Sequence, residues 1–188
     1  NLITNIFIKY GLSKKNSIIC SNAIINAELV GQPSHGIARV VSYINRINKK
    51  VINPKPKIKI KNISASVASI DADNAVGFIG ADLGINQAIQ KTKKTGISFV
   101  AVKNSGHFGL SGFYAERAAK KGLAAFCFTN APPAIAPYGA KKTLFGTNPI
   151  CFACPTATKV PFVLDTSISM INRGKIRRAA KLGEKIPL

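Results

Sequence analysis

The sequence is poor in acidic residues and in histidine. It has 7 acidic against 27 basic residues, a formal net charge of +20, and only two histidines, His35 and His107. Histidine is the side chain that gives or takes a proton near neutral pH without special tuning. Proton-transfer chemistry therefore has few possible positions, and the two histidines are the first candidates.

Long apolar runs are missing as well. No run approaches the roughly 18–20 residues that span a bilayer, and the first residues, Asn1-Leu-Ile-Thr4, resemble no secretory signal. We therefore expect a cytoplasmic protein without membrane association. Cys151-Phe-Ala-Cys154 lies in a stretch typical of a strand, where positions i and i+3 face opposite sides. Buried structural thiols are expected there rather than a redox pair or a zinc site, and a reducing cytoplasm suits them.

Several common site motifs do not occur. There is no G-x-G-x-x-G, no Walker loop, no H-E-x-x-H and no G-x-S-x-G. An ordinary Rossmann nucleotide site, a zinc site and a serine hydrolase are therefore not predicted, and no metal is expected. The excess of basic residues would suit a nucleic-acid-binding module. Because the lysines are scattered in pairs and no RNA-binding aromatic motif accompanies them, we keep that function as an alternative and expect only nonspecific binding at low salt.

The first part of the chain, residues 1–52, is predicted to be helical. Ser13 is a candidate N-cap of a helix that runs to about residue 30, with Ile18, Ile25 and Leu29 on one face. A loop with Gly31, Pro33 and Gly36 follows, and a helix resumes at residue 40. Asn53-Pro-Lys-Pro56 is a linker-like break before the second part, residues 53–188.

The second part alternates between strand and helix patterns. We expect an exposed edge strand over 55–61, a strand over 67–71, a polar turn to residue 77 and a helix over 81–94. A strand over 97–102, a helix over 113–121, three further strands and a basic helix over 174–182 follow. This succession predicts an α/β fold with mixed strand pairing.

Two positions in this pattern suit catalysis or binding. His107 lies in a glycine-flanked turn between a predicted strand and a predicted helix, a place where rigid folds often hold functional groups. Arg39 lies early in a helix, where its guanidinium could grip a carboxylate through two parallel hydrogen bonds. The alternatives are a turn histidine bonded to local backbone and a solvated helix arginine.

The motifs together resemble a known family. The chain resembles the type-2 malate/L-lactate dehydrogenases, a family that also contains ureidoglycolate dehydrogenases and piperideine/pyrroline-carboxylate reductases. The segments that carry the resemblance are Pro33-Ser-His-Gly-Ile-Ala-Arg39 with Tyr43, Asn104-Ser-Gly-His-Phe-Gly109, Thr129-Asn130, Ala136-Pro137, Gly146-Thr-Asn-Pro149 and Leu164-Asp-Thr-Ser167. The resemblance implies a non-Rossmann NAD(P)-binding mixed sheet with flanking helices and an N-terminal helical part. It also implies a cytoplasmic homodimer that oxidises or reduces a small 2-hydroxy or 2-oxo acid.

The resemblance also implies roles for individual residues. His107 matches the proton acceptor of the ureidoglycolate-type members, and Ser34 with His35 matches the proton relay of the imine reductases. Lys175 stands near where that relay carries an aspartate. Arg39 and Thr147 match substrate ligands. The residues that match cofactor contacts are Ala131, Asp165, Thr166 and Ser167.

The resemblance leaves several points open. The sequence stops shortly after residue 182, where family members continue, so we expect a chain shortened at its C-terminus. A non-catalytic remnant of the family is therefore an alternative to an active dehydrogenase. The substrate, the choice between NAD and NADP, and the histidine that accepts the proton are not determined by the sequence.

Overall fold

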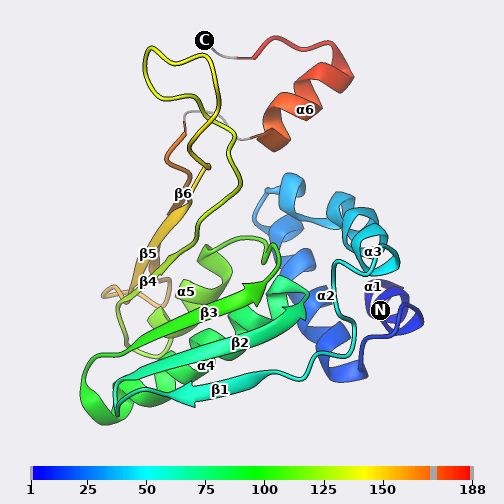
Figure 1. Cartoon of the computed structure of the whole chain (residues 1–188). Helices are drawn as coiled ribbons and strands as arrows, with labels where there is room; N and C mark the ends of the chain where they lie inside the picture. The colour runs from blue at the N-terminus through cyan, green and yellow to red at the C-terminus, as the bar shows by residue number, and fades with distance from the viewer. Residues whose placement is uncertain (1, 170–172, 187–188) are drawn as a thin grey trace.

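The computed structural model describes residues 2–169 and 173–186 of the chain. A group of helices comes first, and Figure 1 shows it gathered at one end of a sheet. Its elements are α1 (Leu2–Lys9), α2 (Lys14–Leu29), the 3-10 turns η1 (Pro33–His35) and η2 (Ile37–Arg39), and α3 (Val40–Asn48). Ser13 caps α2 as predicted, because its hydroxyl accepts a hydrogen bond from the Asn16 amide at 3.2 Å.

The apolar face predicted for α2 is wrong. Ile18 is 42% exposed and Leu29 is 80% exposed. The buried face consists mainly of small residues, namely Ser17, Cys20, Ser21, Ala23, Ile24 and Ala27. Small side chains let neighbouring helices approach closely, so α2 packs against α1 and α4 through a face that hydrophobic periodicity does not reveal.

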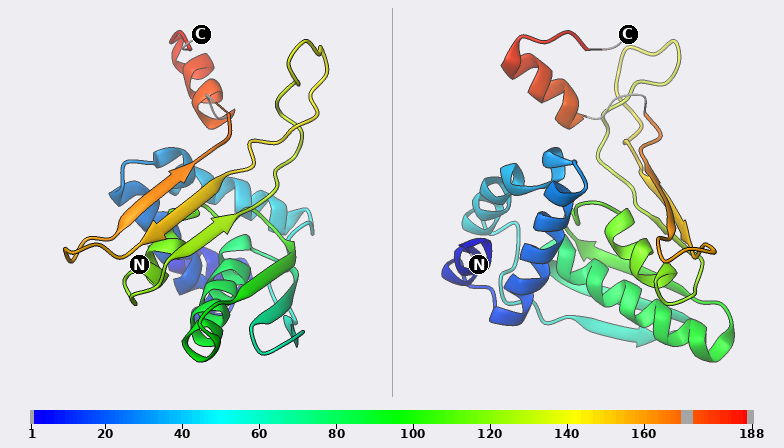
Figure 2. Two further views of the ribbon diagram at one scale, coloured as in Figure 1. Left: turned by 90° about the vertical axis from the view of Figure 1, so that its left-hand side faces the viewer. Right: turned by 180° about the vertical axis from the view of Figure 1, so that it is seen from behind.

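The first sheet has the mixed pairing that the sequence predicted. Its strands are β1 (Lys59–Asn62), β2 (Val67–Ala75) and β3 (Phe99–Ser105), in the order β1-β2-β3. β1 runs antiparallel to β2, and β2 runs parallel to β3. Helix α4 (Gly77–Thr95) makes the crossover and packs on the sheet (Figure 2). β1 is exposed along its whole length, as expected for an edge strand.

Several boundaries differ from the prediction, most clearly around β2, α4 and β3. β2 does not end in a polar turn but continues to Ala75, through Asp73 and Asn74, whose φ angles are 50° and 56°. These two residues lie where the pairing with β3 shifts register, so turn-like composition marks a bulge here. Helix α4 begins at Gly77, four residues earlier than predicted, and β3 extends to Ser105.

The remaining strands form a second sheet instead of continuing the first. Its strands are β4 (Ala125–Phe128), β5 (Ile150–Cys154) and β6 (Phe162–Thr166), in the order β4-β5-β6 and antiparallel throughout. Helix α5 (Gly112–Ala119) packs against this sheet, and α6 (Arg173–Leu182) lies near the C-terminus (Figure 1). The α/β fold with mixed strand pairing that the sequence predicted is thus divided between two three-stranded sheets.

One hydrophobic core joins the N-terminal helices to α4 and β2. It contains Phe7, Ile24 and Tyr43 together with Phe78 and Ile79. A smaller core lies between α5 and the second sheet. The division into residues 1–52 and 53–188 stays a prediction, and the shared core shows that the N-terminal helices pack against the segment that follows them.

All four cysteines are unpaired. Cys151 is fully buried, whereas Cys154, three residues along the same strand, is partly exposed. Burial raises the pKa of Cys151 to about 12 and that of Cys127 to about 11. Both side chains are therefore neutral thiols at physiological pH, which suits the structural role predicted from the sequence.

Candidate active site

His107 lies in the loop that leads from β3 into α5. The loop presses against the start of α4, where the α-carbon of Gly77 is so close to the carbonyls of Gly106 and His107 that any side chain would overlap them. Gly109 has a φ of 81°, and the Phe78 ring lies where its β-carbon would be. The glycines therefore allow the close contact that fixes the backbone around His107.

His35 ends η1, in the loop between α2 and α3. Glu28 holds this loop, because its carboxylate accepts a hydrogen bond from the Ile37 amide at 2.6 Å. Gly36 lies against the same carboxylate and leaves no room for a β-carbon unless Glu28 moves. The Ser34 hydroxyl is 3.0 Å from Nδ1 of His35. The Ser34–His35 pair therefore has a defined place at the end of α2.

The two loops bring the histidines together. The ring centroids of His35 and His107 are 5.4 Å apart, and the rings stack at 23°. The Tyr43 hydroxyl, from α3, lies 2.7 Å from Nδ1 of His107, and the Gly109 amide donates to the same nitrogen at 3.2 Å. Residues far apart in the sequence thus form one cluster of hydrogen-bonding side chains.

Arg39 adds a positive charge to this cluster. Burial, followed by the charges of Arg39, His35 and Arg46, lowers the pKa of His107 to about 3. Burial and Arg39 also lower the pKa of His35, partly offset by Asp165. Both rings are therefore neutral at pH 7. The buried Nε of Arg39 has no hydrogen-bond partner among the described residues, and such a donor fits a ligand that carries an acceptor.

A cleft of about 570 Å³ opens beside His35. This volume lies in the range of small-molecule sites. Its walls come from the end of α2, the start of α5 and the end of β6. The predicted site residues that line it are His35, Thr147, Asp165, Thr166 and Ser167. Among the described residues, Ser34, Arg39 and His107 do not line the cleft. His107 lies behind His35, the ring on which it stacks and which does line the cleft.

All four predicted cofactor contacts have hydrogen-bond partners within the protein. The Thr166 hydroxyl donates to the Ser167 carbonyl at 3.1 Å, and the Ser167 hydroxyl donates to the Ser169 carbonyl at 2.9 Å. A carboxylate oxygen of Asp165 accepts a hydrogen bond from the Gly112 amide at 2.7 Å, at the start of α5, where negative charge suits the helix dipole. The Ala131 amide donates to the side-chain carbonyl of Asn148 at 2.8 Å. Ala131 therefore lies beside the segment that carries Thr147 but outside the lining of the cleft.

Tyr43 is a further functional candidate. It stands beside the motif that ends at Arg39, but no role was predicted for it. It follows Arg39 by four residues, a spacing that puts two helical side chains on one face. The four-residue spacing from Arg39 was the signal in the sequence that could have identified Tyr43. In the structure, Tyr43 is 3% exposed and its ring lies against those of Phe78 and His107. The side chain of Lys175 lies outside what the structure describes.

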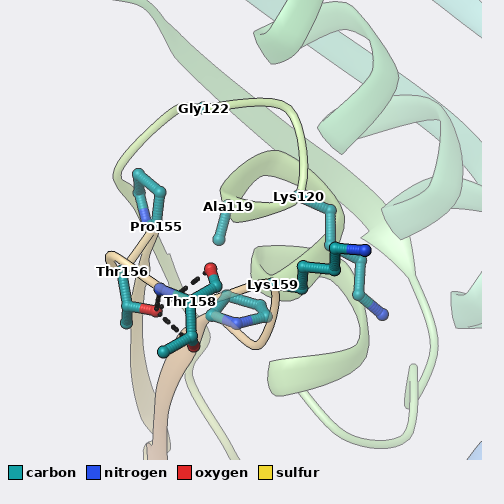
Figure 3. Close-up of a pocket in the computed structure, with 8 residues that line it drawn as sticks. Ala119, Lys120, Gly122, Pro155, Thr156, Thr158 and Lys159 are labelled. Carbon is teal, nitrogen blue, oxygen red and sulfur yellow. Dashed lines mark hydrogen bonds between the residues drawn. The ribbon is translucent and has the colours of Figure 1, made fainter.

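A second, smaller hollow of about 290 Å³ lies at the other end of α5 (Figure 3). Lys120, Lys159, Thr156 and Thr158 line it, and the two threonine hydroxyls are 2.9 Å apart. It contains no residue that the sequence assigned to a site. Within residues 2–169 and 173–186, no three His, Cys, Asp or Glu side chains gather as a metal site would require. No helix in those ranges is long and apolar enough to cross a membrane.

Sequence comparison identifies the class of protein. The profile of the malate/L-lactate dehydrogenase family matches residues 1–188. L-sulfolactate dehydrogenase of Methanocaldococcus jannaschii is 38% identical over 186 residues, which are 99% of this chain and 54% of that protein. The (2R)-3-sulfolactate dehydrogenase (NADP(+)) of Chromohalobacter salexigens is 38% identical over 179 residues, 94% of this chain and 53% of that protein. Ureidoglycolate dehydrogenase (NAD(+)) of Escherichia coli K12 is 28% identical over 186 residues, 99% of this chain and 53% of that protein.

Solved structures agree with this assignment. Malate dehydrogenase of Entamoeba histolytica superimposes with a TM-score of 0.94 at 31% identity, covering 98% of this chain and 52% of that one. The Δ1-piperideine-2-carboxylate reductase of Pseudomonas syringae gives 0.94 at 29% identity, covering 99% of this chain and 56% of that one. The chain therefore belongs to the malate/L-lactate dehydrogenase family, which confirms the resemblance seen in the sequence. It spans about half the length of the relatives that it matches.

Proposed function

We propose that the protein takes part in hydride transfer between NAD or NADP and a small 2-hydroxy or 2-oxo acid, with His35, His107 and Ser34 handling the proton. The stacked histidines beside the unpartnered Nε of Arg39 carry this proposal. Oxidation of a hydroxyl needs a base for its proton, and a neutral imidazole can take it and return it in the reverse direction. Both imidazoles are neutral at pH 7, because burial lowers the pKa of each.

Arg39 is assigned to the substrate carboxylate. Malate, lactate, sulfolactate and ureidoglycolate, the acids in the names of the family and its members, all have a carboxylate beside the carbon that carries the hydroxyl. A guanidinium can bind a carboxylate through two parallel hydrogen bonds and fix the neighbouring carbon relative to the histidines. Thr147, on the wall of the cleft, is the second substrate contact that we propose.

The cleft fits the nicotinamide end of the cofactor. Thr166 and Ser167 place hydroxyl groups on its wall. Because both hydroxyls donate to backbone carbonyls, their oxygens can accept hydrogen bonds from the ribose hydroxyls and the amide N–H of the cofactor. Asp165 already accepts the amide at the start of α5, so a phosphate is not expected there. Ala131 is assigned a contact through the segment that carries Thr147. When bound, the cofactor supplies the hydride chemistry, and the protein orients both reactants and excludes water.

Binding experiments test the proposal directly. NADH and NADPH should each be titrated into the protein, and a saturable change in nicotinamide fluorescence is expected for at least one of them. Malate, lactate and sulfolactate should then be compared as competitors or co-ligands. Arg39→Ala should weaken acid binding by about 10-fold to 100-fold, because a charge-assisted bond is lost. Arg46→Ala is the matched control, since it removes the same charge from an exposed position of α3, the helix that begins directly after Arg39.

Two results would contradict the proposal. The first is the absence of any fluorescence change at millimolar NADH and NADPH, which would favour a remnant that binds no cofactor. The second is an equal loss of acid binding in Arg39→Ala and Arg46→Ala, which would mean that Arg39 acts only through the overall positive charge and not by binding the carboxylate directly.

A second copy of the chain is the partner that we propose. One face of the second sheet consists of large apolar side chains that are exposed: Phe126 (67%), Phe128 (60%), Ile150 (45%), Phe162 (50%) and Leu164 (52%). An apolar patch of this kind marks an interaction surface. Two identical chains usually form a dimer through the same surface on each copy. Sedimentation should show a dimer that Phe128→Lys dissociates, whereas Lys61→Glu, on the exposed edge strand, should not change it. A monomer at all concentrations would contradict this assignment.

The cytoplasm is the compartment that we propose. Support comes from the four unpaired cysteines, two of which, Cys127 and Cys151, lie opposite each other on neighbouring strands. A reducing compartment keeps such thiols free. Fractionation of the source cells should place the protein in the soluble cytoplasmic fraction, and recovery from another compartment would contradict the proposal.

A further inference from the structure

The hydrogen bonds around His107 decide which ring nitrogen carries its proton. Nδ1 has two neighbours, the Gly109 amide at 3.2 Å and the Tyr43 hydroxyl at 2.7 Å. A backbone amide can only donate, so Nδ1 must be unprotonated to accept from it. The tyrosine hydroxyl can then donate to the same lone pair. Both bonds are satisfied only when the proton of the neutral ring is on Nε2.

Tyr43 is held in place as a donor. It is 3% exposed, and its ring packs against Phe78 with centroids 5.1 Å apart. Burial raises the pKa of Tyr43 well above its usual value, so the hydroxyl keeps its proton at physiological pH. The charged and titratable groups that act on Tyr43 and His107 are Arg39, Arg46, His35 and Cys20. Arg39 forms a side-chain hydrogen bond with Tyr43, and because a guanidinium can only donate, the tyrosine oxygen accepts it and keeps its own proton for Nδ1 of His107.

The neighbouring histidine is not constrained in this way. Nδ1 of His35 faces the Ser34 hydroxyl at 3.0 Å. A hydroxyl can donate or accept by rotating about its C–O bond. The neutral ring of His35 can therefore carry its proton on Nδ1, which leaves Nε2 free to accept a proton. His35 is also the histidine that lines the cleft.

We propose that Tyr43 is a positioning residue that, with the Gly109 amide, holds His107 as the Nε2–H tautomer, so that His107 donates a hydrogen bond to the substrate oxygen and His35 takes the proton. This assignment rests on the proposed dehydrogenase function. In oxidation, the O–H bond of the substrate breaks and its proton goes to Nε2 of His35. The C–H electron pair leaves as hydride to oxidised nicotinamide, and the C=O bond forms while Nε2–H of His107 binds its oxygen. In reduction, His35 returns the proton.

Nitrogen NMR of the histidine rings tests the tautomer without cofactor or substrate. Protein labelled with 15N-histidine gives separate signals for protonated and unprotonated ring nitrogens, and loss of a signal set in His35→Gln and in His107→Gln assigns them. We expect His107 to show an unprotonated Nδ1 and a protonated Nε2, unchanged between about pH 8 and about pH 5. A protonated Nδ1 at His107, or a ring that titrates in that interval, would overturn the proposal.

Substitution then tests the part played by Tyr43. Tyr43→Phe keeps the packing and removes one hydrogen bond to Nδ1, so the ratio of the two His107 tautomers should shift about fivefold towards Nδ1–H. Tyr10→Phe is the control, because Tyr10 packs against the same core and, among the described residues, neither histidine has a ring contact with it. An unchanged His107 spectrum in Tyr43→Phe would contradict the role of Tyr43. Because no cofactor is present, failure here is distinct from failure of the cofactor titration, which tests the dehydrogenase function itself.

Discussion

His107 couples the stability of the protein to pH. Its pKa is lowered from 6.5 to about 3 in the folded chain. As the pH falls below about 6.5, the unfolded chain takes up a proton that the folded chain does not, so stability that is present above this pH is lost on acidification. Between pH 7 and pH 5 the contribution of His107 to the free energy of unfolding should fall by about 2 kcal/mol.

Urea unfolding at the two pH values measures this effect. The wild-type protein should lose about 2 kcal/mol more than His107→Gln between pH 7 and pH 5, because glutamine does not titrate. The contribution of His35 is common to both proteins and cancels in the comparison. Equal losses in the two proteins would mean that His107 is protonated in the folded state as easily as in the unfolded chain.

At the level of single residues, the sequence identified the groups but not how they are connected. His35, Arg39 and His107 were selected from the local motifs, and the structure places them in one cluster. The bond between Tyr43 and His107 joins α3 to the loop that follows β3, 64 residues further along the chain. Local sequence carries no signal for such a contact, because it depends on how α3 packs against Phe78.

The start of α4 is the element that supports the His107 loop. A β-carbon on Gly77 would overlap the backbone carbonyls of Gly106 and His107. Because these are backbone atoms, relieving the overlap would require the helix or the loop to move. Gly77→Ala should therefore destabilise the protein by about 3 kcal/mol or more and displace the loop. Gly106→Ala is the matched control. Its β-carbon would find its nearest neighbours at 3.6 Å, so a change below about 1 kcal/mol is expected.

Thermal unfolding of both variants provides the measurement, and the His107 ring signals report the loop. Equal stability of the two alanine variants would contradict this prediction, since the close approach would then be relieved by a small shift of α4.

At the level of elements, helices and strands followed from periodicity, whereas their ends and pairing did not. Asp73 and Asn74 have turn-like composition, yet they lie in β2, because the pairing with β3 resumes at Ala75 after the shift in register. β4 pairs with β5 and not with β3, and α5 packs against this second sheet. Strand order depends on such long-range packing, which no local pattern encodes.

The whole molecule combines a strong positive charge with an exposed apolar sheet face, and these two features call for different partners. The apolar face is confined to β4–β6. The lysines are instead spread over α2, β1, α4 and the loops, so no single basic groove follows from them. Dimer formation is therefore expected to depend on the sheet face and to persist in salt, because burial of apolar surface is not screened by ions.

Binding to polyanions should behave in the opposite way. With a net charge of +20, the protein should bind duplex DNA and heparin alike at about 0.01 M salt. The attraction is long-ranged there, and it should be lost by about 0.15 M salt, where the Debye length is about 8 Å. Fluorescence anisotropy across this salt range, with a DNA duplex and heparin as parallel ligands, measures both affinities. Binding to DNA that survives at about 0.15 M salt, when heparin has dissociated, would require contacts to bases and would support the nucleic-acid-binding alternative. Equal release of both ligands would leave the charge as a property of composition, separate from the site at the histidines.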